Sequence, residues 1–141
     1  MTEPHPIPEG YALSPPDAGF LTLIGPLYVK RRADGRFLLA MRAGKEHQNR
    51  YGVMHGGMLA TLADVAIGMN LARAGKGVET QLTLNLSIDF IDAAHTGDWI
   101  EAHVNLTKIG GRVCFGDCDL RVGERVVTRA HATFYVTRSL S

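Results

Sequence analysis

The sequence lacks a long apolar run, and its charges almost cancel. No stretch of the 141 residues approaches the roughly 18–20 consecutive apolar residues that a membrane-spanning helix needs. The first ten residues hold three prolines and two glutamates but no apolar segment, which argues against a secretory signal. The formal net charge is +1, so the chain carries no acidic tail. It also lacks the overall positive charge that would indicate binding to nucleic acid. We therefore expect no membrane partner and no nucleic-acid partner.

Cysteine is also scarce. Cys114 and Cys118 lie four residues apart in what the pattern predicts to be one strand, where their Cα atoms would be roughly 13 Å apart. That distance is too long for a disulfide, so we expect two free thiols and, since free thiols are typical of reducing compartments, a cytoplasmic location. The six histidines form no close pair in the sequence and neither cysteine is near one, so we predict no metal site.

The composition is that of one globular domain. Hydrophobic residues make up 45% of the sequence and charged residues 21%, which argues against disorder. A chain of this length can bury one hydrophobic core but not two. Residues 1–18 are rich in proline, serine and aspartate and are expected to form an N-terminal arm. Residues 19–141 are expected to form the domain.

One segment has the spacing of a helix. Leu59, Leu62, Ala66 and Met69 recur at intervals of three and four, which predicts a helix over residues 58–74. Glycines at positions 75 and 77 supply its end. Because most of its circumference is apolar or small, other elements should wrap around this helix.

The rest of the chain has the pattern of strands. Two apolar runs, residues 21–30 and 36–42, flank an Asp-Gly pair and predict a hairpin. After the helix, apolar and polar residues alternate with a period of two. Leu82, Leu84, Leu86, Ile88 and Phe90 thus share one predicted face. Further strands are predicted over residues 100–107, 112–122 and 125–137. One helix and an antiparallel meander make an α+β fold of five or six strands.

The segment before the helix carries candidate chemistry. Gly56 and Gly57 at a helix start leave backbone N–H groups unobstructed and without intrahelical partners. With the positive end of the helix dipole, these donors suit a developing oxyanion. The imidazole of His55, just before them, would help to polarise a carbonyl group or hold the loop.

Asp64 is an unusual residue for an apolar helix. Burying a carboxylate without a partner is costly, so Asp64 should face a polar cavity or a neutralising charge. A carboxylate in such a setting is a typical general base. It lies eight residues beyond Gly56, or about 12 Å along a helix, too far to share one small reaction centre. If both residues serve one site, a second subunit has to complete it. We therefore predict a homodimer with two composite sites.

The spacing of these residues resembles the signature of the phenylacetic-acid-degradation (PaaI-type) branch of the hotdog-fold acyl-CoA thioesterases. Five residues separate Asn49 from the His55-Gly56-Gly57 run, and six more separate that run from Asp64. Residues 83–90 resemble the family's strand after the central helix, and residues 129–134 its usual final strand. The resemblance covers about residues 19–137 and implies the hotdog fold, in which the sheet wraps a long central helix.

The resemblance also implies an activity and roles for the residues. Asp64 would act at the carbonyl of an acyl- or aryl-CoA thioester, as general base on water or as nucleophile. The amide of Gly56 or of Gly57 would stabilise the oxyanion. His55 would support it, and Asn49 would position the thioester or the water.

Other parts of the family's site match more loosely. Thr83 stands where the family often has a serine or threonine that helps to place water. The acyl chain of the family lies in a tunnel between subunits, for which Leu59, Leu62 and Met69 are candidate lining residues. The CoA nucleotide rests on surface basic groups, and coenzyme A as part of the substrate is the sole cofactor expected. The matching positions are Gly110, Gly111, Arg112, Lys108 and Arg138. The family often forms homotetramers as pairs of dimers.

Each site residue also has a structural explanation. Asp64 would bond a backbone turn, His55 would brace the loop, and the two glycines would permit close helix packing. Asn49 would close its own loop, and Thr83 would be an ordinary strand residue. The basic residues would be solvated surface charges.

Three alternatives stay open, and one of them is that the ligand is not a thioester at all. A hotdog hydratase or dehydratase also uses a histidine and a carboxylate, but in a different local arrangement. A non-catalytic acyl-CoA-binding protein is the second alternative, although residues 1–18 are too short for the DNA-binding segment of such a regulator. The acyl group stays open between aryl and aliphatic, with the few aromatic residues weakly against an aryl site. The leaving group stays open between CoA and a carrier protein.

Overall fold

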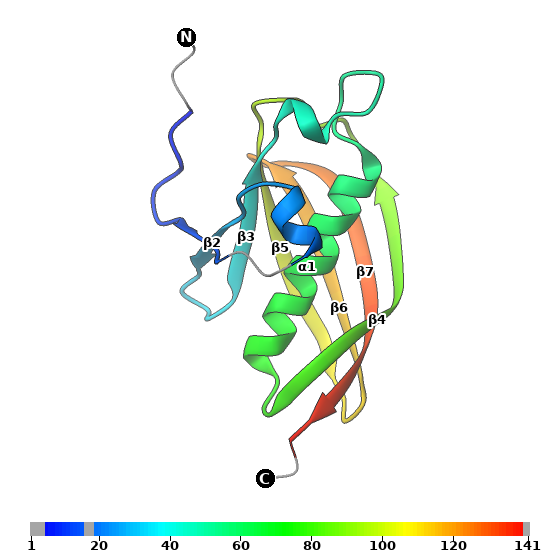
Figure 1. Cartoon of the computed structure of the whole chain (residues 1–141). Coiled ribbons are helices and arrows are strands. Elements are labelled where there is room, and N and C mark those ends of the chain that lie inside the picture. The colour runs from blue at the N-terminus through cyan, green and yellow to red at the C-terminus, as the bar shows by residue number, and fades with distance from the viewer. Residues whose placement is uncertain (1–4, 16–18, 140–141) are drawn as a thin grey trace.

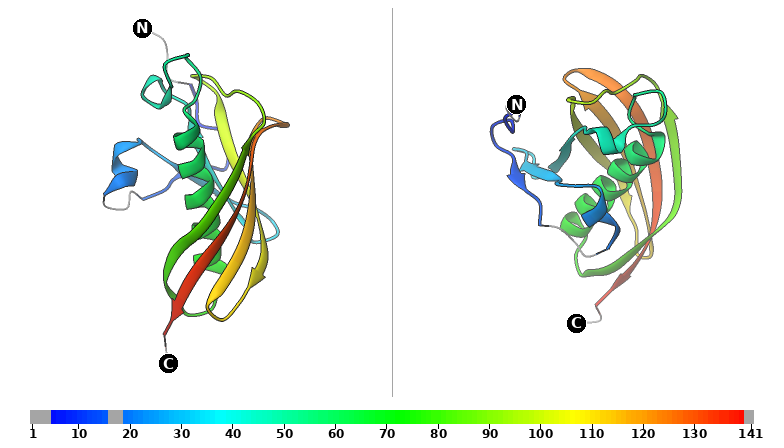
Figure 2. Two further views of the ribbon diagram at one scale, coloured as in Figure 1. Left: turned by 90° about the vertical axis from the view of Figure 1, so that its right-hand side faces the viewer. Right: turned by 45° about the horizontal axis from the view of Figure 1, so that its top comes forward.

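A computed structural model describes residues 5–15 and 19–139. In it one long helix, α1 (Gly56–Ala74), lies across one face of a single antiparallel sheet (Figure 1). The sheet curves around the helix, as the turned views make clear (Figure 2). This arrangement confirms the predicted α+β fold with a wrapped central helix. No helix in the described part of the chain is long and apolar enough to cross a membrane.

The sheet has seven strands. In chain order they are β1 (Ala12–Leu13), β2 (Tyr28–Arg31), β3 (Phe37–Arg42), β4 (Val78–Phe90), β5 (Trp99–Ile109), β6 (Val113–Val122) and β7 (Arg125–Arg138). Their order in space is β1-β2-β3-β5-β6-β7-β4, so β1 and β4 form the edges. Two short 3₁₀ helices, η1 (Phe20–Leu23) and η2 (Lys45–His47), lie in the connections.

The N-terminal region differs from the prediction. A strand is expected over residues 21–30, but only β2 is extended there and residues 20–23 form η1. Gly19 and Gly25 bracket η1 with φ angles of 89° and 87°, left-handed values that interrupt an extended run. Residues 12–13 of the expected arm pair with β2, which raises the strand count to seven. Residues 1–4 and 16–18 of that arm, and residues 140–141, lie outside the described residues.

The core fills the space between α1 and the sheet. Leu62, Ile67, Ile100 and Leu120 have no exposed surface. Cys114 and Cys118 are both buried and free, as expected, and burial raises the pKa of the Cys118 thiol to about 12. The Cys118 thiol is therefore protonated and inert at neutral pH.

A β-bulge divides β4 into two halves. In the pairing with β7, Thr83 lies opposite Phe134 and Asn85 opposite Thr133, so Leu84 is an extra residue. The extra residue reverses the side-chain alternation. Leu86, Ile88 and Phe90 face the helix as predicted. Leu82 and Leu84 are 64% and 60% exposed, so their predicted place on that face is wrong.

One buried polar side chain fastens α1 to the sheet. Asn70, on the helix, is 4% exposed. Its Oδ1 accepts a hydrogen bond from the N–H of Phe37 at 2.9 Å, and its Nδ2 donates to the carbonyl of Phe37 at 3.0 Å. Because Phe37 is the first residue of β3, this pair of bonds fixes the start of that strand against the helix.

Replacing Asn70 with alanine should lower the free energy of unfolding by about 1–3 kcal/mol, because the peptide groups of Phe37 lose their partner in a buried position. Urea denaturation measures the change. Asn105→Ala, at an exposed position of β5, is the matched control and should change it by less than about 0.5 kcal/mol. An Asn70→Ala protein as stable as the wild type would contradict the assignment.

Candidate active site

The helix start leaves one backbone donor available. α1 begins at Gly56 with His55 as its N-cap. His55 Nδ1 accepts a hydrogen bond from the N–H of Gly57 at 2.8 Å, and the His55 carbonyl accepts from Met58 and Leu59 at 2.9 and 3.2 Å. No described residue accepts a hydrogen bond from the N–H of Gly56. Of the two glycines, Gly56 is therefore the one with a free donor at the positive end of the helix dipole.

Both glycines also have close neighbours. A Cβ atom on Gly56 would lie 3.2 Å from Cζ of Phe90, at the end of β4. A Cβ atom on Gly57 would lie 3.0 Å from Nδ1 of His55. The packing role expected of the glycines is thus present, and it coexists with the free donor.

Asn49 closes the loop in front of the helix. Its Oδ1 accepts hydrogen bonds from the N–H groups of Tyr51 and Val53 at 2.8 and 3.4 Å. Its backbone N–H donates to the carbonyl of Val53 at 2.8 Å. The structural role of Asn49 is therefore real, and it uses only the oxygen. No described residue accepts a hydrogen bond from the side-chain amide nitrogen.

A cavity of about 530 Å³ joins the loop to the helix start. Asn49, Gly56, Leu59, Phe90 and Ile91 line it. The structure thus brings Asn49 and Gly56 to one cavity, together with Leu59. Leu62, a further candidate, has no exposed surface and belongs to the core.

Asp64 and Thr83 are in contact. Thr83 precedes the bulge in β4, whereas Phe90, which lies beside Gly56, follows it. Thr83 Oγ1 donates a hydrogen bond to Asp64 Oδ1 at 2.6 Å. Asp64 is half-buried, and no ion pair of the described residues includes it. The sequence predicts either a polar cavity or a neutralising charge next to Asp64, and the described residues provide no such charge. Thr83 keeps one carboxylate oxygen fixed.

One chain does not assemble all of the predicted site. Asp64 does not line the cavity that holds Asn49 and Gly56. The expected basic turn lies at the opposite end of α1. There, Arg138 donates to the carbonyls of Lys76 and Gly111, so it holds the turn in place. The other members of this group are Gly110, Gly111, Arg112 and Lys108, of which all but Gly110 are exposed.

Sequence reasoning missed the residue that supports the loop from inside. His47 is 6% exposed, and its Nδ1 accepts from the N–H of Gly44 at 2.9 Å while Nε2 lies 2.6 Å from the carbonyl of Ile24. Its own carbonyl accepts from the N–H of His55 at 2.8 Å. The bonds assign the proton to Nε2. A histidine in a polar, irregular stretch carries no signal in sequence that distinguishes it from a surface residue.

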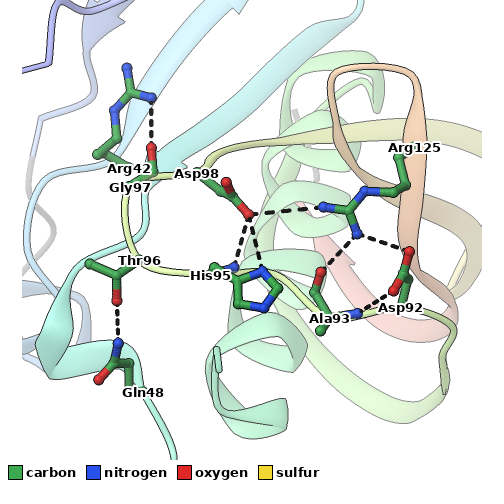
Figure 3. Close-up of polar contacts among 9 residues, drawn as sticks. All are labelled: Arg42, Gln48, Asp92, Ala93, His95, Thr96, Gly97, Asp98 and Arg125. Carbon is green, nitrogen blue, oxygen red and sulfur yellow. Dashed lines mark hydrogen bonds and ion pairs between the residues drawn. The ribbon is translucent and has the colours of Figure 1, made fainter. Parts of the chain in front are cut away.

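Sequence reasoning also missed the network that holds the cavity wall, residues 91–94 (Figure 3). Arg125, at the start of β7, donates to the carbonyl of Ala93 at 2.8 Å and pairs with Asp92 at 2.9 Å. It also lies 4.0 Å from Asp98, whose carboxylate accepts from the N–H of His95 at 2.8 Å. The hydrogen bond from Arg125 holds the pKa of Asp92 below its usual range. Both carboxylates are thus fixed on one guanidinium.

The same wall is tied to the Asn49 loop. The N–H of Met54 donates to the carbonyl of Ala94 at 2.8 Å, and Gln48 donates to Thr96. The loop and the wall therefore form one unit, anchored by Arg125 to β7. No group of three metal-ligating side chains is found within residues 5–15 and 19–139.

Comparison with known proteins identifies the family. The model of the thioesterase superfamily matches residues 51–129, more than half of the chain. The chain belongs to the thioesterase superfamily. This thioesterase is 35% identical over 130 residues to a Pseudomonas aeruginosa protein named as a putative esterase, covering 92% of this chain and 97% of that one.

Two further comparisons agree. Human acyl-coenzyme A thioesterase 13 is 28% identical over 101 residues, 72% of this thioesterase and 71% of that protein. The crystal structure of a hypothetical thioesterase from Streptococcus pneumoniae with coenzyme A has a TM-score of 0.72 and 28% identity, covering 80% of this chain and 90% of that one. These findings confirm the hotdog-fold thioesterase family that the sequence resembles. The protein is a thioester hydrolase.

Arg125→Gln should lower kcat/KM by about two- to tenfold, the scale of one or two lost hydrogen bonds, mainly through a higher KM. The cavity wall would loosen, while Asp64 is not in contact with it.

Because the folded-state pKa of Asp92 is lowered, the ion pair is present at neutral pH and is lost as pH falls through that lowered pKa. The difference in melting temperature between the two proteins should therefore shrink in acid. Arg129→Gln is the control, because Arg129 also lies on β7 and its exposed ion pair is with Asp119 of β6. An equal effect of both variants would refute the assignment.

Proposed function

We propose that this thioesterase hydrolyses an acyl-CoA to the free acid and CoA, with Asp64 as general base or nucleophile and the Gly56 amide as oxyanion donor. The free N–H of Gly56, at a helix start that opens into a cavity, is the observation that carries the proposal. Human acyl-coenzyme A thioesterase 13 and the coenzyme A complex of the S. pneumoniae thioesterase support the CoA ester as substrate. Structures of that bacterial protein also include alanine variants of an aspartate and of a threonine.

The chemistry follows from the bonds already formed. Thr83 occupies Oδ1 of Asp64, so Oδ2 is the oxygen that would take a proton from water. The resulting hydroxide attacks the thioester carbonyl, whose oxygen becomes an anion and accepts a hydrogen bond from Gly56. When the carbon–sulfur bond breaks, the proton passes from Asp64 to the departing thiolate. If Asp64 attacks directly, an anhydride forms first and water hydrolyses it.

His55 and Asn49 take supporting roles in this proposal. His55 Nδ1 is bound to the N–H of Gly57, so His55 fixes the helix start and Gly57 is not the oxyanion donor. Asn49 has its oxygen committed to the loop and offers its amide nitrogen to the thioester or the water.

Asp64 and Gly56 would meet across a dimer. The free edge of β4 is thirteen residues long and carries unpaired backbone groups that a second copy can satisfy. Thr83 stands beside Asp64, and Phe90 stands beside Gly56. Two β4 strands paired antiparallel, with Thr83 opposite the partner's Phe90, would therefore build the composite site twice.

The bulge sets the register of this pairing. Opposite residues of an antiparallel pair point to the same face of the sheet. With Ser87 on the two-fold axis, Leu86 lies opposite the partner's Ile88, and both point inward. The extra residue at Leu84 then brings Thr83 opposite the partner's Phe90. A regular strand would leave these two residues on different faces.

The dimer would also bring in the basic turn. Antiparallel helices place the C-terminal end of the partner's α1 beyond the N-terminal end of this one. Arg112 and Lys108 of that subunit would then lie near the Asn49 loop, where they could bind the CoA phosphates. The turn glycines Gly110 and Gly111, held by Arg138, would serve as its support.

Exposed apolar residues on the sheet and the buried thiols support two further parts of the proposal, the homotetramer and the location. Tyr135 and Phe115 are 37% and 40% exposed on the outer face of the sheet, near the exposed Leu82. Burying this patch between two dimers would give a homotetramer. The buried free thiols favour the cytoplasm.

Asp64→Asn should reduce kcat for thiol release by at least about 10²-fold, because the amide can still accept from Thr83 but cannot take a proton. The assay is thiol release from acetyl-, octanoyl-, palmitoyl- and phenylacetyl-CoA. Asp117→Asn is the matched control, since Asp117 accepts a similar bond from Thr107 at 3.1 Å on the exposed sheet surface. Full activity of Asp64→Asn would refute the mechanism. Hydration of an enoyl-CoA without thiol release would favour the hydratase. Binding of a CoA ester without turnover would favour the non-catalytic binding protein.

Ser87→Cys should form a disulfide-linked dimer on mild oxidation. Two cysteines on the axis would have Cα atoms about 4.5–5.5 Å apart, within disulfide range. Non-reducing electrophoresis detects the product, and the native cysteines are buried. Thr80→Cys, on the same exposed strand but seven residues from the axis, should stay unlinked. Linkage of Thr80→Cys instead, or a wild type that is monomeric, would disprove this register.

A further inference from the structure

All four polar groups of His47 have hydrogen-bond partners, although its side chain is buried. The backbone N–H donates to the carbonyl of Gly44 at 3.1 Å, and the backbone carbonyl accepts from the N–H of His55 at 2.8 Å. In the ring, Nδ1 accepts from the N–H of Gly44 at 2.9 Å, and Nε2 donates to the carbonyl of Ile24 at 2.6 Å. A neutral imidazole can accept with one nitrogen and donate with the other across a rigid ring. His47 therefore holds η2 between the end of η1 and the start of α1.

The hydrogen bond between His47 and His55 acts on the free donor of the proposed site. The N–H of Gly56 belongs to the same planar peptide unit as the carbonyl of His55. That carbonyl accepts hydrogen bonds from the first turn of α1, which fixes the peptide unit relative to the helix. The bond to His47 ties the same residue to the loop in front of the helix. The direction of the Gly56 N–H relative to that loop therefore depends on where His47 lies.

His47 is also close in the chain to the second group of the proposed site. Asn49 follows it by two residues, and Asn49 and Gly56 line the same cavity. Because the side-chain oxygen of Asn49 is bonded within its own loop, its amide nitrogen moves only with that loop. A shift of His47 would therefore change the distance between the Gly56 N–H and the Asn49 amide nitrogen.

We infer that His47 is a positioning residue of the proposed reaction, and that its ring sets how the oxyanion donor Gly56 lies relative to Asn49. The inference rests on the proposed function. His47 does not line the cavity that Asn49 and Gly56 share, so it acts through His55 and the loop and not by contact with the substrate. A donor stabilises an oxyanion only when it is aimed at the place where the charge develops, and a displacement of about 1 Å can cost about 10² in rate.

The two hydrogen bonds of the ring are not equivalent. The bond from Gly44 spans three residues and lies beside the backbone bond that already closes η2. The bond to Ile24 spans 23 residues, and the side chain of Ile24 is part of the core. The bond to Ile24 thus ties η2 to a distant fixed point, and its loss should displace the loop more than loss of the bond from Gly44.

The competing explanation is that His47 only stabilises the fold. A buried histidine with two satisfied ring nitrogens would then contribute to the free energy of unfolding and to nothing else. The two roles differ in their kinetics. A misdirected oxyanion donor lowers kcat and kcat/KM together, because the interaction is made only in the transition state. A loss of stability leaves the kcat of the folded enzyme unchanged.

The test compares His47→Asn with His47→Gln. The asparagine oxygen can still accept from Gly44, and the glutamine nitrogen can still donate to Ile24. His47→Asn should lower kcat for thiol release about 10- to 100-fold with KM within about twofold of the wild type, and His47→Gln should lower it about three- to tenfold. Each protein is assayed at a temperature at which its unfolding curve shows it to be folded, and one folded variant is enough. An unchanged kcat would overturn the inference.

Two controls separate positioning from stability. Asn70→Ala loses a buried polar contact toward the other end of α1 and should keep the wild-type kcat. His103→Gln makes one of the same substitutions on the outer face of the sheet, where the side chain is 21% exposed, and should also keep it. A fall in kcat in Asn70→Ala as large as that in His47→Asn would show that lost stability is the cause, and the inference would be wrong.

Hydrogen exchange separates this inference from the proposed function, because it needs no substrate. Followed by NMR, the amide proton of His55 should exchange about three- to tenfold faster in His47→Asn than in the wild type, relative to the amides of β6, as one weakened hydrogen bond requires. Absence of CoA-ester hydrolysis by the wild type would refute the proposed function alone. An unchanged exchange rate of the His55 amide in both His47 variants would refute the inference, whatever the activity.

Discussion

One extra residue in β4 decides what faces α1. Residues of a strand alternate between two faces, so a regular β4 with Leu86 and Ile88 turned inward would turn Thr83 outward. The bulge at Leu84 reverses the alternation, and Thr83 reaches the carboxylate of Asp64. A half-buried carboxylate in an otherwise apolar helix thereby gains a hydrogen bond without gaining a countercharge.

The backbone N–H groups at the start of α1 do not all have hydrogen-bond partners. Four N–H groups at the N-terminus of any helix lack intrahelical partners. Three of the four have partners here: the N–H of Gly57 donates to the ring of His55, that of Met58 to the His55 carbonyl, and that of His55 itself to the carbonyl of His47. The remaining donor, on Gly56, is bordered by the ring of Phe90. An apolar ring beside a free N–H excludes water, which strengthens the interaction of that N–H with an anion.

The sequence predicts this fold well where the periodicity is unambiguous. The helix, the hairpin around Asp34 and the strands after the helix follow from local pattern and turn chemistry. The bulge cannot be predicted from the sequence, because Leu82 and Leu84 continue a perfect alternation of apolar and polar residues. Only the pairing with β7 interrupts that alternation. η1 was missed because an apolar run of ten residues reads as a strand, although two glycines bracket its first part. The site motif predicts Asn49, Gly56 and Asp64, and the structure brings the first two of these to one cavity. Arg125 and His47 act through contacts between segments far apart in the chain, and no local pattern reports such contacts.

The position of Asp64 on α1 has a consequence for how the proposed site can be completed. Asp64 lies eight residues beyond Gly56, about 12 Å along the helix axis. Its carboxylate is held by Thr83 of β4, the strand at the free edge of the sheet. The N–H of Gly56 lies at the helix start, beside the cavity that Asn49 and Phe90 line. A thioester carbonyl held by that N–H is therefore out of reach of the carboxylate on the same helix. In the proposed mechanism the attacking carboxylate must come from the other subunit: a monomer could polarise the carbonyl, but its own Asp64 would stand more than two helical turns away.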